Sequence, residues 1–218
     1  TFTYTVSHDL KAPLRGISGY STLLMEDHAD ELDEEGKTYL QNLVNATERM
    51  NILIEDLLAY SRTERHEIKK TNIDLSEMID KILVEHRVVF EQNKITLIKE
   101  LSCVELFSDR EALTQALRNL VDNAIKFSKE QEKPEIQIRS EIVGKNCRIS
   151  IQDNGIGFDM KFHDKIFEIF QRLHLAEDYA GTGVGLALVR KAIERLGGKV
   201  WATSEIGKGS IFYMDIPL

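Results

Sequence analysis

The spacing of apolar residues divides the chain into two parts with different periods. Up to about residue 66 the pattern is that of long helices without strands. The first helix carries a seam of apolar residues at intervals of four, three and seven, formed by Leu10, Leu14, Ile17 and Leu24. Such a seam is typical of helices that pair side by side. An acidic stretch ending in Gly36 then predicts a solvated connection to a second helix over residues 37–65.

The second helix is apolar over more than one narrow stripe. Its apolar positions include Leu40, Leu43, Val44, Met50, Leu53, Ile54, Leu57 and Leu58. A lone helical hairpin cannot bury a surface this wide. We therefore expect residues 1–66 to form a homodimer in which two hairpins make a four-helix bundle.

After residue 66, helical and strand patterns alternate. Helical spacing is found over residues 75–90, 109–127 and 183–196. A capping box from Ser108 to Glu111 opens the second of these helices. Alternating apolar and polar positions predict strands over residues 95–98, 135–142, 146–152, 199–204 and 209–216. This order predicts an α+β fold in which residues 67–218 form an α/β sandwich of helices on a sheet.

The charge of the chain narrows the classes of partner. The formal net charge is -8, and residues 1–66 carry 12 acidic and 6 basic side chains. Nucleic acids and anionic membranes bind clustered Lys and Arg, so we expect neither as a partner. No apolar run approaches the roughly 18 residues of a membrane span, and the N-terminus lacks the pattern of a signal peptide. We expect a cytoplasmic protein, with Cys103 and Cys147 as reduced core thiols rather than a disulfide.

His8 is the first candidate for chemistry. On a helix it shares a face with Lys11 and Arg15, opposite the apolar seam, so we expect its imidazole to be accessible. An accessible, near-neutral imidazole can act as a nucleophile at physiological pH, and Asp9 can orient the ring through one nitrogen. The alternative is a surface histidine near a frayed helix start, with Pro13 as the first helical residue.

A polar stripe marks the helix predicted over residues 109–127. Asn119, Asn123 and Lys126 follow one another at helical spacing, opposite an apolar face. Amide oxygens are suitable ligands for Mg²⁺, and a lysine one turn on can meet phosphate oxygens. The alternative is a solvated helix face, although two asparagines in mid-helix carry a propensity cost.

Asp153 and the first glycine group form the third candidate. Ile149 and Ile151 face inward on one predicted strand, and Asp153 continues their row. A buried carboxylate needs a partner, and the exocyclic amine of adenine would serve as one. Gly155 and Gly157 would let the backbone approach a flat base closely, although they could equally form a plain turn.

A second glycine group opens a later helix. Gly181, Gly183 and Gly185 surround Thr182, and the backbone N–H groups of this segment could hold phosphates. The polar, glycine-containing residues 171–182 are expected to form a mobile lid. A lone glycine motif is weak support for such a site, and a plain turn is the alternative.

Together these segments resemble the histidine kinase family over nearly the whole chain. Residues 7–15 look like its H-box and residues 119–127 like its N-box. Residues 153–157 and 181–185 are similar to its two glycine boxes, and residues 167–170 to its F-box. The segment after the F-box is similar to the lid of phytochrome-like and related PAS-linked kinases. Five motifs in the correct order are far more specific than any one of them.

The resemblance implies a fold and a reaction. It implies a dimerisation and histidine phosphotransfer domain over residues 1–66 and a Bergerat-type ATP-binding domain over residues 67–218. Such an enzyme uses ATP and Mg²⁺ to phosphorylate its own histidine, here His8. It then passes the phosphoryl group to an aspartate in the receiver domain of a response regulator. The chain would be a fragment of a larger protein whose upstream sensor domain lies outside it.

The resemblance also implies a role for each matching residue. His8 would accept the phosphoryl group with help from Asp9, and Asn123 would coordinate Mg²⁺. Asp153 would read adenine, and Arg172 would approach the γ-phosphate. The other implied nucleotide contacts are Asn119, Lys126, Gly155, Gly157, Gly181, Thr182, Gly183 and Gly185.

Two positions separate this chain from related enzymes. ATPases of the same fold place a glutamate four residues before the metal-binding asparagine, where this chain has Asn119, so water lacks a general base. Kinases that are also phosphatases often carry Thr or Asn where this chain has Ala12, which argues against strong phosphatase activity. A pseudokinase that serves as a scaffold and a serine-directed kinase are competing interpretations, although the serine-directed kinase would not need His8.

Overall fold

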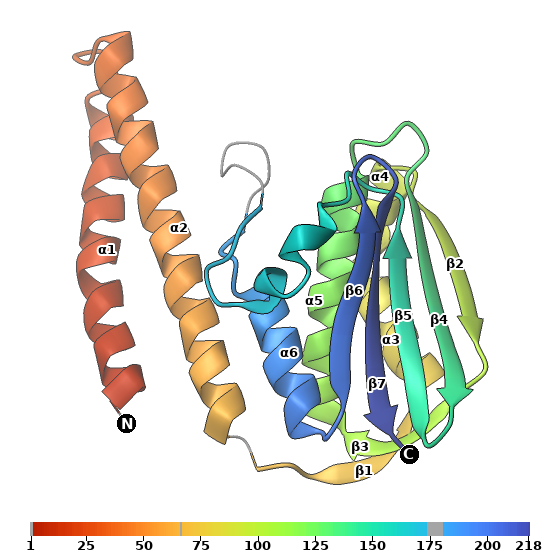
Figure 1. The fold of residues 1–218 in the computed structure, drawn as a ribbon. Coiled ribbons are helices and arrows are strands. Elements are labelled where there is room, and N and C mark those ends of the chain that lie inside the picture. Colours follow the sequence, from red (N-terminus) through yellow and green to blue (C-terminus); the bar gives the residue numbers. More distant parts are fainter. Residues whose placement is uncertain (1, 66, 174–180) are drawn as a thin grey trace. The chain divides into compact units, whose positions relative to one another are not determined.

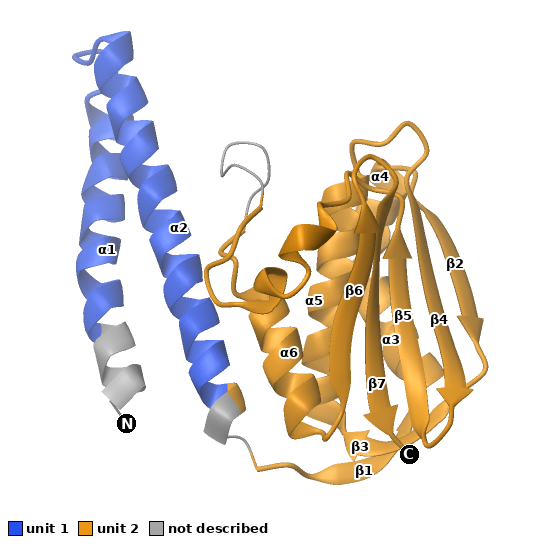
Figure 2. Ribbon diagram, viewed as in Figure 1, with its two compact units in different colours: residues 1–62 blue, residues 63–218 orange. Residues whose placement is uncertain are grey.

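The chain folds as two compact units. The computed structural model describes residues 2–65, 67–173 and 181–218 (Figure 1). Residues 1–62 form the first unit, a pair of helices, and residues 63–218 form the second, in which helices pack on a sheet (Figure 2). The predicted order of a helical hairpin followed by an α/β sandwich is therefore confirmed.

The first unit consists of helix α1 (Phe2–Asp27) and all but the last turn of helix α2 (Glu34–Arg65). Pro13 lies inside α1, so the alternative in which Pro13 is the first helical residue is wrong. An ion pair of 2.9 Å between Lys11 Nζ and Glu55 Oε1 joins the two helices. Among the described residues, no helix is long and apolar enough to cross a membrane.

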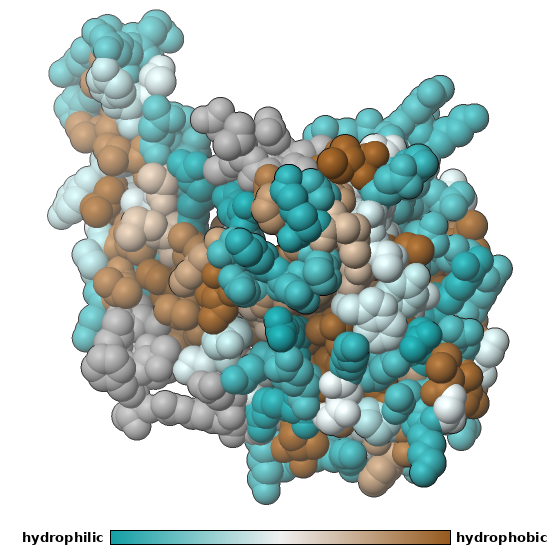
Figure 3. Space-filling view, viewed as in Figure 1, coloured by the Kyte–Doolittle hydropathy of each residue, from teal (hydrophilic) through white to brown (hydrophobic). Residues whose placement is uncertain are grey.

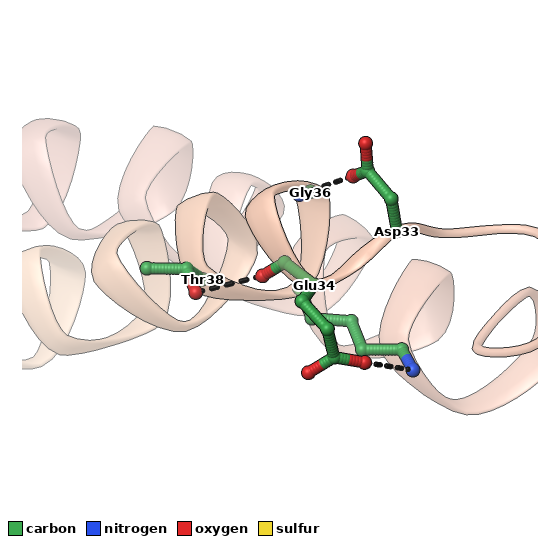
Figure 4. A network of polar contacts seen from close by, with 5 residues as sticks. Asp33, Glu34, Gly36 and Thr38 are labelled. Atoms are coloured by element: carbon green, nitrogen blue, oxygen red, sulfur yellow. Dashed lines mark hydrogen bonds and ion pairs between the residues drawn. The ribbon is translucent and has the colours of Figure 1, made fainter.

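Helix α2 begins a few residues earlier than the sequence pattern predicts. Asp33 caps it, because its Oδ1 accepts a hydrogen bond of 2.7 Å from the N–H of Gly36 (Figure 4). Glu34 and Glu35 occupy the first turn, where negative charge complements the positive end of the helix dipole. The acidic residues predicted to form only a solvated connection therefore also start the second helix.

The apolar seam of the first unit is only partly covered within one chain, and brown apolar patches are visible along the hairpin in Figure 3. Leu14 and Ile54 are buried. The other seam residues remain about half exposed, at 47% for Leu10, 45% for Ile17 and 45% for Leu24. Helix α2 likewise exposes Leu43, Met50, Ile52 and Leu57. One hairpin therefore carries apolar surface that it cannot bury by itself.

The second unit is built on a five-stranded sheet with strand order β2-β4-β5-β7-β6. The strands are β2 (Thr96–Leu101), β4 (Glu135–Val143), β5 (Asn146–Asp153), β6 (Lys199–Glu205) and β7 (Gly209–Pro217). Strands β2 and β4 run parallel, and the other neighbours are antiparallel. Each predicted strand is found at its expected place in the sequence.

Three helices cover one face of this sheet (Figure 1). They are α3 (Leu75–Glu85), α5 (Arg110–Ser128) and α6 (Gly185–Arg195). The apolar face of α5 packs on the inward rows of β4 and β5, and Leu113, Leu120 and Ile149 are fully buried in this core. Two short 3-10 turns, Met160–Phe162 and Lys165–Phe167, lie between β5 and α6 in the sequence.

The helix predicted over residues 75–90 is divided in two. Helix α3 ends at Glu85, and a short helix α4 (Arg87–Gln92) follows. His86 lies between them with φ -97° and ψ 3°, and its N–H closes the last turn of α3. The apolar pattern continues across this break, and neither Gly nor Pro marks it. Periodicity alone could therefore not locate it.

A small second sheet was not predicted. Strands β1 (Lys70–Asp74) and β3 (Glu105–Asp109) pair antiparallel, with Ile73 opposite Leu106. These two apolar residues are buried, whereas most other positions of the two strands are exposed. Five-residue strands with so few buried positions give almost no period to detect.

The cap of α5 is Asp109 rather than Ser108. Asp109 Oδ1 accepts a hydrogen bond of 2.9 Å from the N–H of Ala112, and its Oδ2 accepts one of 2.7 Å from the N–H of Lys69. Ser108 belongs to strand β3. The predicted capping box is wrong because the neighbouring carboxylate has two oxygens and bonds two separate N–H groups.

Cys103 and Cys147 form a disulfide in the structure, with Cα atoms 6.1 Å apart. Both residues are buried in the core of the second unit. The prediction of two reduced thiols is therefore wrong for this structure. A separation of 44 residues gave no sign of proximity in the sequence. Their approach depends on the pairing of the chain after β2 with β4, where the N–H of Ser102 donates to the Ser140 carbonyl at 2.8 Å.

Candidate functional site

The predicted polar stripe of α5 is present and half-buried. Asn119, Asn123 and Lys126 each have intermediate exposure, whereas the opposite face of the helix lies in the core. Asn119 Nδ2 donates to the carbonyl of Gln115 at 2.9 Å, which fixes the direction of the amide. A Cβ added at Gly185 would lie 2.8 Å from Asn119 Oδ1. The stripe therefore faces the start of α6 rather than open solvent.

Lys126 lies beside the second glycine group. A Cβ added at Gly181 would lie 2.9 Å from Lys126 Nζ. Burial lowers the pKa of the Lys126 ammonium, and repulsion from Arg172 and then Lys129 lowers it further. The cationic surroundings of Lys126, which itself lies beside Gly181, favour an anion, such as phosphate, at this place.

Asp153 ends β5 at the edge of the core, as the inward-facing row predicts. It is 3% exposed. Burial raises the pKa of the Asp153 carboxyl to about 6, and hydrogen bonds from the backbone N–H groups of Gly155 and Ser210 oppose that rise. The bond from Gly155 to Oδ1 is 2.9 Å. Since a buried carboxylate is costly, a hydrogen-bond donor from a ligand would be strongly favoured here.

The first glycine group is packed too closely for any side chain. A Cβ at Gly155 would lie 2.4 Å from the carbonyl oxygen of Phe127, at the end of α5. Gly157 has φ +62°, and its Cβ would lie 2.1 Å from the carbonyl oxygen of Glu205. This loop therefore connects the end of α5 with the hairpin between β6 and β7.

The second glycine group is linked to the segment that resembles an F-box. Gly183 has φ +76°, and its carbonyl accepts a hydrogen bond of 3.0 Å from the N–H of Phe170. Phe170 itself has φ +65°, which is rare for an aromatic residue. Gly185 is the first residue of α6, so free backbone N–H groups at a helix start lie beside Asn119.

The candidate site therefore combines three segments of the second unit. Gly185 lies against Asn119, Gly181 against Lys126, and Gly155 against the end of α5. The site residues predicted in this unit come from these segments and from Arg172, which is exposed. Most of the predicted lid, including His174, Glu177 and Tyr179, lies outside the described residues.

The predicted phosphate acceptor belongs to the first unit. His8 lies within α1, but its side chain is outside the described residues. Asp9 follows it and is exposed. The accessibility of the His8 imidazole therefore stays a prediction.

Sequence reasoning missed two serines next to Asp153. Ser210 is 7% exposed and pairs with Asp153 across β5 and β7, and Ser204 lies next to it on β6. A signal for Ser210 was present in the sequence. Strand β7 follows the glycine turn at residues 207–209, and its first inward position is a polar residue in an otherwise apolar row.

Two sequence-family models match the chain. Residues 108–218 match the model described as "Histidine kinase-, DNA gyrase B-, and HSP90-like ATPase", and residues 1–66 match the His Kinase A (phospho-acceptor) domain. The chain belongs to this histidine kinase-like ATPase family. The order of a phospho-acceptor domain followed by this ATPase domain is that of a histidine kinase catalytic core, as the resemblance implied.

Individual histidine kinases resemble the chain in sequence and in fold. The chain is 37% identical over 217 residues to the phytochrome-like protein Cph1 of Synechocystis, covering all of this chain and 29% of that protein. The histidine kinase AdeS of Acinetobacter baumannii superposes with a TM-score of 0.69 at 27% identity, over 96% of this chain and 97% of that one. Histidine kinase ThkA, solved in complex with response regulator protein TrrA, gives 0.68 at 28% identity, over 99% and 60%. The chain spans less than a third of the length of its first curated relatives.

Proposed function

We propose that this chain is the part of a histidine kinase that transfers the γ-phosphoryl group of ATP to His8 and then to an aspartate of a response regulator. Residues 1–66 would serve as the dimerisation and phosphotransfer domain, and residues 67–218 as the ATP-binding domain. The matches to a phospho-acceptor domain and to the ATPase family support both assignments.

The site in the second unit fits a nucleotide. Asp153 would accept a hydrogen bond from the amine of adenine, with Gly155 and Gly157 allowing the base to approach. Lys126, beside Gly181, and Arg172 would bind phosphates. The backbone N–H groups of Gly181, Thr182, Gly183 and Gly185 would complete that phosphate site.

A magnesium ion fits beside the same helix. Asn123 would be its ligand, because an amide oxygen is a hard, neutral donor, and Asn119 would contact the metal or a phosphate. When bound, Mg²⁺ neutralises the charge that develops on the phosphate oxygens. The half-buried polar stripe supports this assignment, since a purely solvated helix face would not lie against a glycine.

One observation favours transfer to a histidine over hydrolysis. Asn119 occupies the place of the catalytic glutamate in the related ATPases, and its amide is held by Gln115. An amide cannot take a proton from water, so no general base is present at that position. A ring nitrogen of His8 needs no such base, because its lone pair attacks the γ-phosphorus while the bond to the ADP oxygen breaks. Asp9 would hold the other ring nitrogen through its proton.

The first unit would supply both the dimer contact and the docking surface for the regulator. The apolar seam that one hairpin leaves half exposed supports a bundle of two hairpins. The complex of ThkA with a response regulator, at 28% identity, supports a partner of that class. We place the chain in the cytoplasmic part of a larger sensor protein.

Incubation with γ-labelled ATP and Mg²⁺ tests the proposal. The chain should acquire an acid-labile, base-stable label that His8→Gln removes by more than about a hundredfold, because no other group would be positioned for attack. His28→Gln is the matched control, since His28 is an exposed histidine of the same hairpin, and it should keep the label.

Three results would favour a different function. Label that survives His8→Gln would reject His8 as the acceptor. Steady release of phosphate without labelled protein would favour an ATPase, and the absence of nucleotide binding would favour a scaffold.

A further inference from the structure

A row of three polar side chains crosses the sheet beside the first glycine group. Asp153 of β5 lies opposite Ser210 of β7, and Ser210 lies opposite Ser204 of β6. Residues directly opposite each other in antiparallel strands project from the same face. Asp153 and Ser210 are both buried, so this row lies on the covered face of the sheet.

The hydroxyl of Ser204 has three contacts within hydrogen-bond distance. It accepts from the N–H of Phe158 at 2.8 Å and donates to the carbonyl of Gly209 at 2.9 Å. Its third neighbour is Ser210 Oγ, at 3.0 Å. Ser204 therefore joins the residue just after the first glycine group to the start of β7.

These contacts determine the direction of the bond between the two serines. A hydroxyl has one proton and two lone pairs. The carbonyl of Gly209 can only accept, so it takes the Ser204 proton, and the N–H of Phe158 takes one lone pair. The remaining lone pair of Ser204 can bind Ser210 only if Ser210 donates. Ser210 then keeps its own lone pairs as acceptors next to Asp153.

Ser210 and Asp153 thus form a pair of acceptors. The ionised carboxylate of Asp153 only accepts, and the backbone N–H of Ser210 already donates to it. Adenine carries an amine that donates hydrogen bonds, whereas guanine carries a carbonyl oxygen at the same ring position. Two acceptors side by side therefore match the amino-bearing base and repel the other.

We propose that Ser204 is a positioning residue that holds the Ser210 hydroxyl as an acceptor beside Asp153 and thereby strengthens selection of adenine over guanine nucleotides. This inference rests on the proposed nucleotide site. Ser204 does not need to touch the nucleotide, because it acts through the proton of Ser210. Without it, the Ser210 hydroxyl can rotate and donate to a guanine oxygen.

Calorimetric titration of the chain with Mg-ADP and with Mg-GDP tests the proposal. Ser204→Ala should reduce the ratio of the ADP to the GDP affinity about fivefold, the effect of one hydrogen bond. Ser204→Thr keeps the hydroxyl and should retain the ratio. A merely structural role would weaken both nucleotides together and leave the ratio unchanged.

Ser140→Ala is the matched control. Ser140 is also buried, donates to the Cys103 carbonyl at 2.6 Å and accepts from the Cys103 N–H at 3.2 Å. Its loss removes similar hydrogen bonds away from Asp153, so the ratio should not change. In a Ser210→Ala background, adding Ser204→Ala should have no further effect on the ratio.

The outcomes separate this inference from the proposed function. A folded Ser204→Ala chain with the wild-type ratio would overturn the inference while leaving nucleotide binding intact. If the wild-type chain binds neither nucleotide, the proposed function and the inference both fail. If Ser204→Ala does not fold, Ser204→Cys decides, because a thiol is a weak hydrogen-bond acceptor. A reduced ratio then supports the inference, and an unchanged ratio overturns it.

Discussion

The two units of this chain bury their apolar residues to very different degrees. In the second unit, the apolar faces of α5 and α6 and the inward rows of the sheet are almost completely covered. In the hairpin, Leu14 and Ile54 are buried, but Leu10, Ile17 and Leu24 are nearly half exposed. Apolar side chains are thus buried in the second unit, whereas several of them stay exposed to solvent in the hairpin.

The difference indicates which unit can be stable by itself. Apolar burial contributes about 25 cal/mol per Å² and is the main favourable term in folding. The second unit obtains it within one chain, whereas the hairpin leaves Leu10, Ile17 and Leu24 about half exposed. The proposed nucleotide site therefore lies on a unit that buries its own apolar residues, and the proposed acceptor histidine lies on a unit that we expect to dimerise.

The largest effect on stability is expected at Gly157, where two backbone segments of the second unit are in close contact. Gly157→Ala places a Cβ within 2.1 Å of a carbonyl oxygen at φ +62°. Strain and overpacking together should lower the free energy of unfolding by about 2–4 kcal/mol and abolish nucleotide binding. Urea unfolding and calorimetry would measure the two effects.

Gly144→Ala provides the control for that substitution. Gly144 has nearly the same φ, +63°, but its Cβ would meet nothing within 4 Å. Only the backbone strain should remain, about 1 kcal/mol, with nucleotide binding intact. An equal loss of unfolding free energy in both variants would show that the close packing at Gly157 does not contribute to stability.

A smaller effect is expected from the buried carboxyl. Burial raises the pKa of Asp153 from 3.8 to about 6 in the folded chain, so its ionised form destabilises the unliganded fold above that pH. Asp153→Asn should raise the free energy of unfolding at pH 7.5 by about 1–3 kcal/mol. The gain should shrink as the pH falls through about 6 and vanish near pH 4, while nucleotide affinity drops at every pH.

Asp159→Asn is the matched control for the pH dependence. Hydrogen bonds from Lys161 lower the pKa of this exposed carboxyl, so neutralising it should bring no stability. The measurement is urea unfolding as a function of pH. On acidification, the stability of the wild-type chain should rise toward that of Asp153→Asn. If the difference stays constant, burial of the Asp153 carboxylate is not its cause.

The smallest change in free energy is expected for the association of two hairpins into a dimer. Leu43→Glu places a charge on the exposed apolar surface of α2 and should weaken dimerisation by about tenfold or more. Sedimentation equilibrium would measure it. Ile142→Glu is the control, since Ile142 is 62% exposed at the end of β4 and should leave the oligomeric state unchanged. A monomeric wild-type chain would contradict the expectation that a second hairpin covers the exposed apolar residues of the first.

The sequence predicted those features that depend on a repeated pattern. The strands around Ile149 and the polar stripe of α5 were found because burial imposes a period of two or of 3.6 residues. The burial of Asp153 followed from the same alternation. The close contacts of Gly155 with Phe127 and of Gly157 with Glu205 could be seen only in the fold.

Features that depend on single contacts between distant residues were missed. The break at His86 leaves the apolar pattern intact, and the second hydrogen bond of Asp109 comes from the N–H of Lys69, which is 40 residues away in sequence. Cys103 meets Cys147 only after the sheet has formed. Ser204 and Ser210 acquire their arrangement from neighbouring strands, which no local pattern encodes.

The two hydrogen bonds of the Asp109 carboxylate couple two segments of the second unit during local unfolding. One carboxylate holds the first turn of α5 through Ala112 and the chain before β1 through Lys69, which is 40 residues away in sequence. Fraying of the first turn of α5 and detachment of β1 therefore both require a hydrogen bond of the Asp109 side chain to break. Amide protons in both segments should exchange with solvent in one cooperative opening rather than in two independent ones.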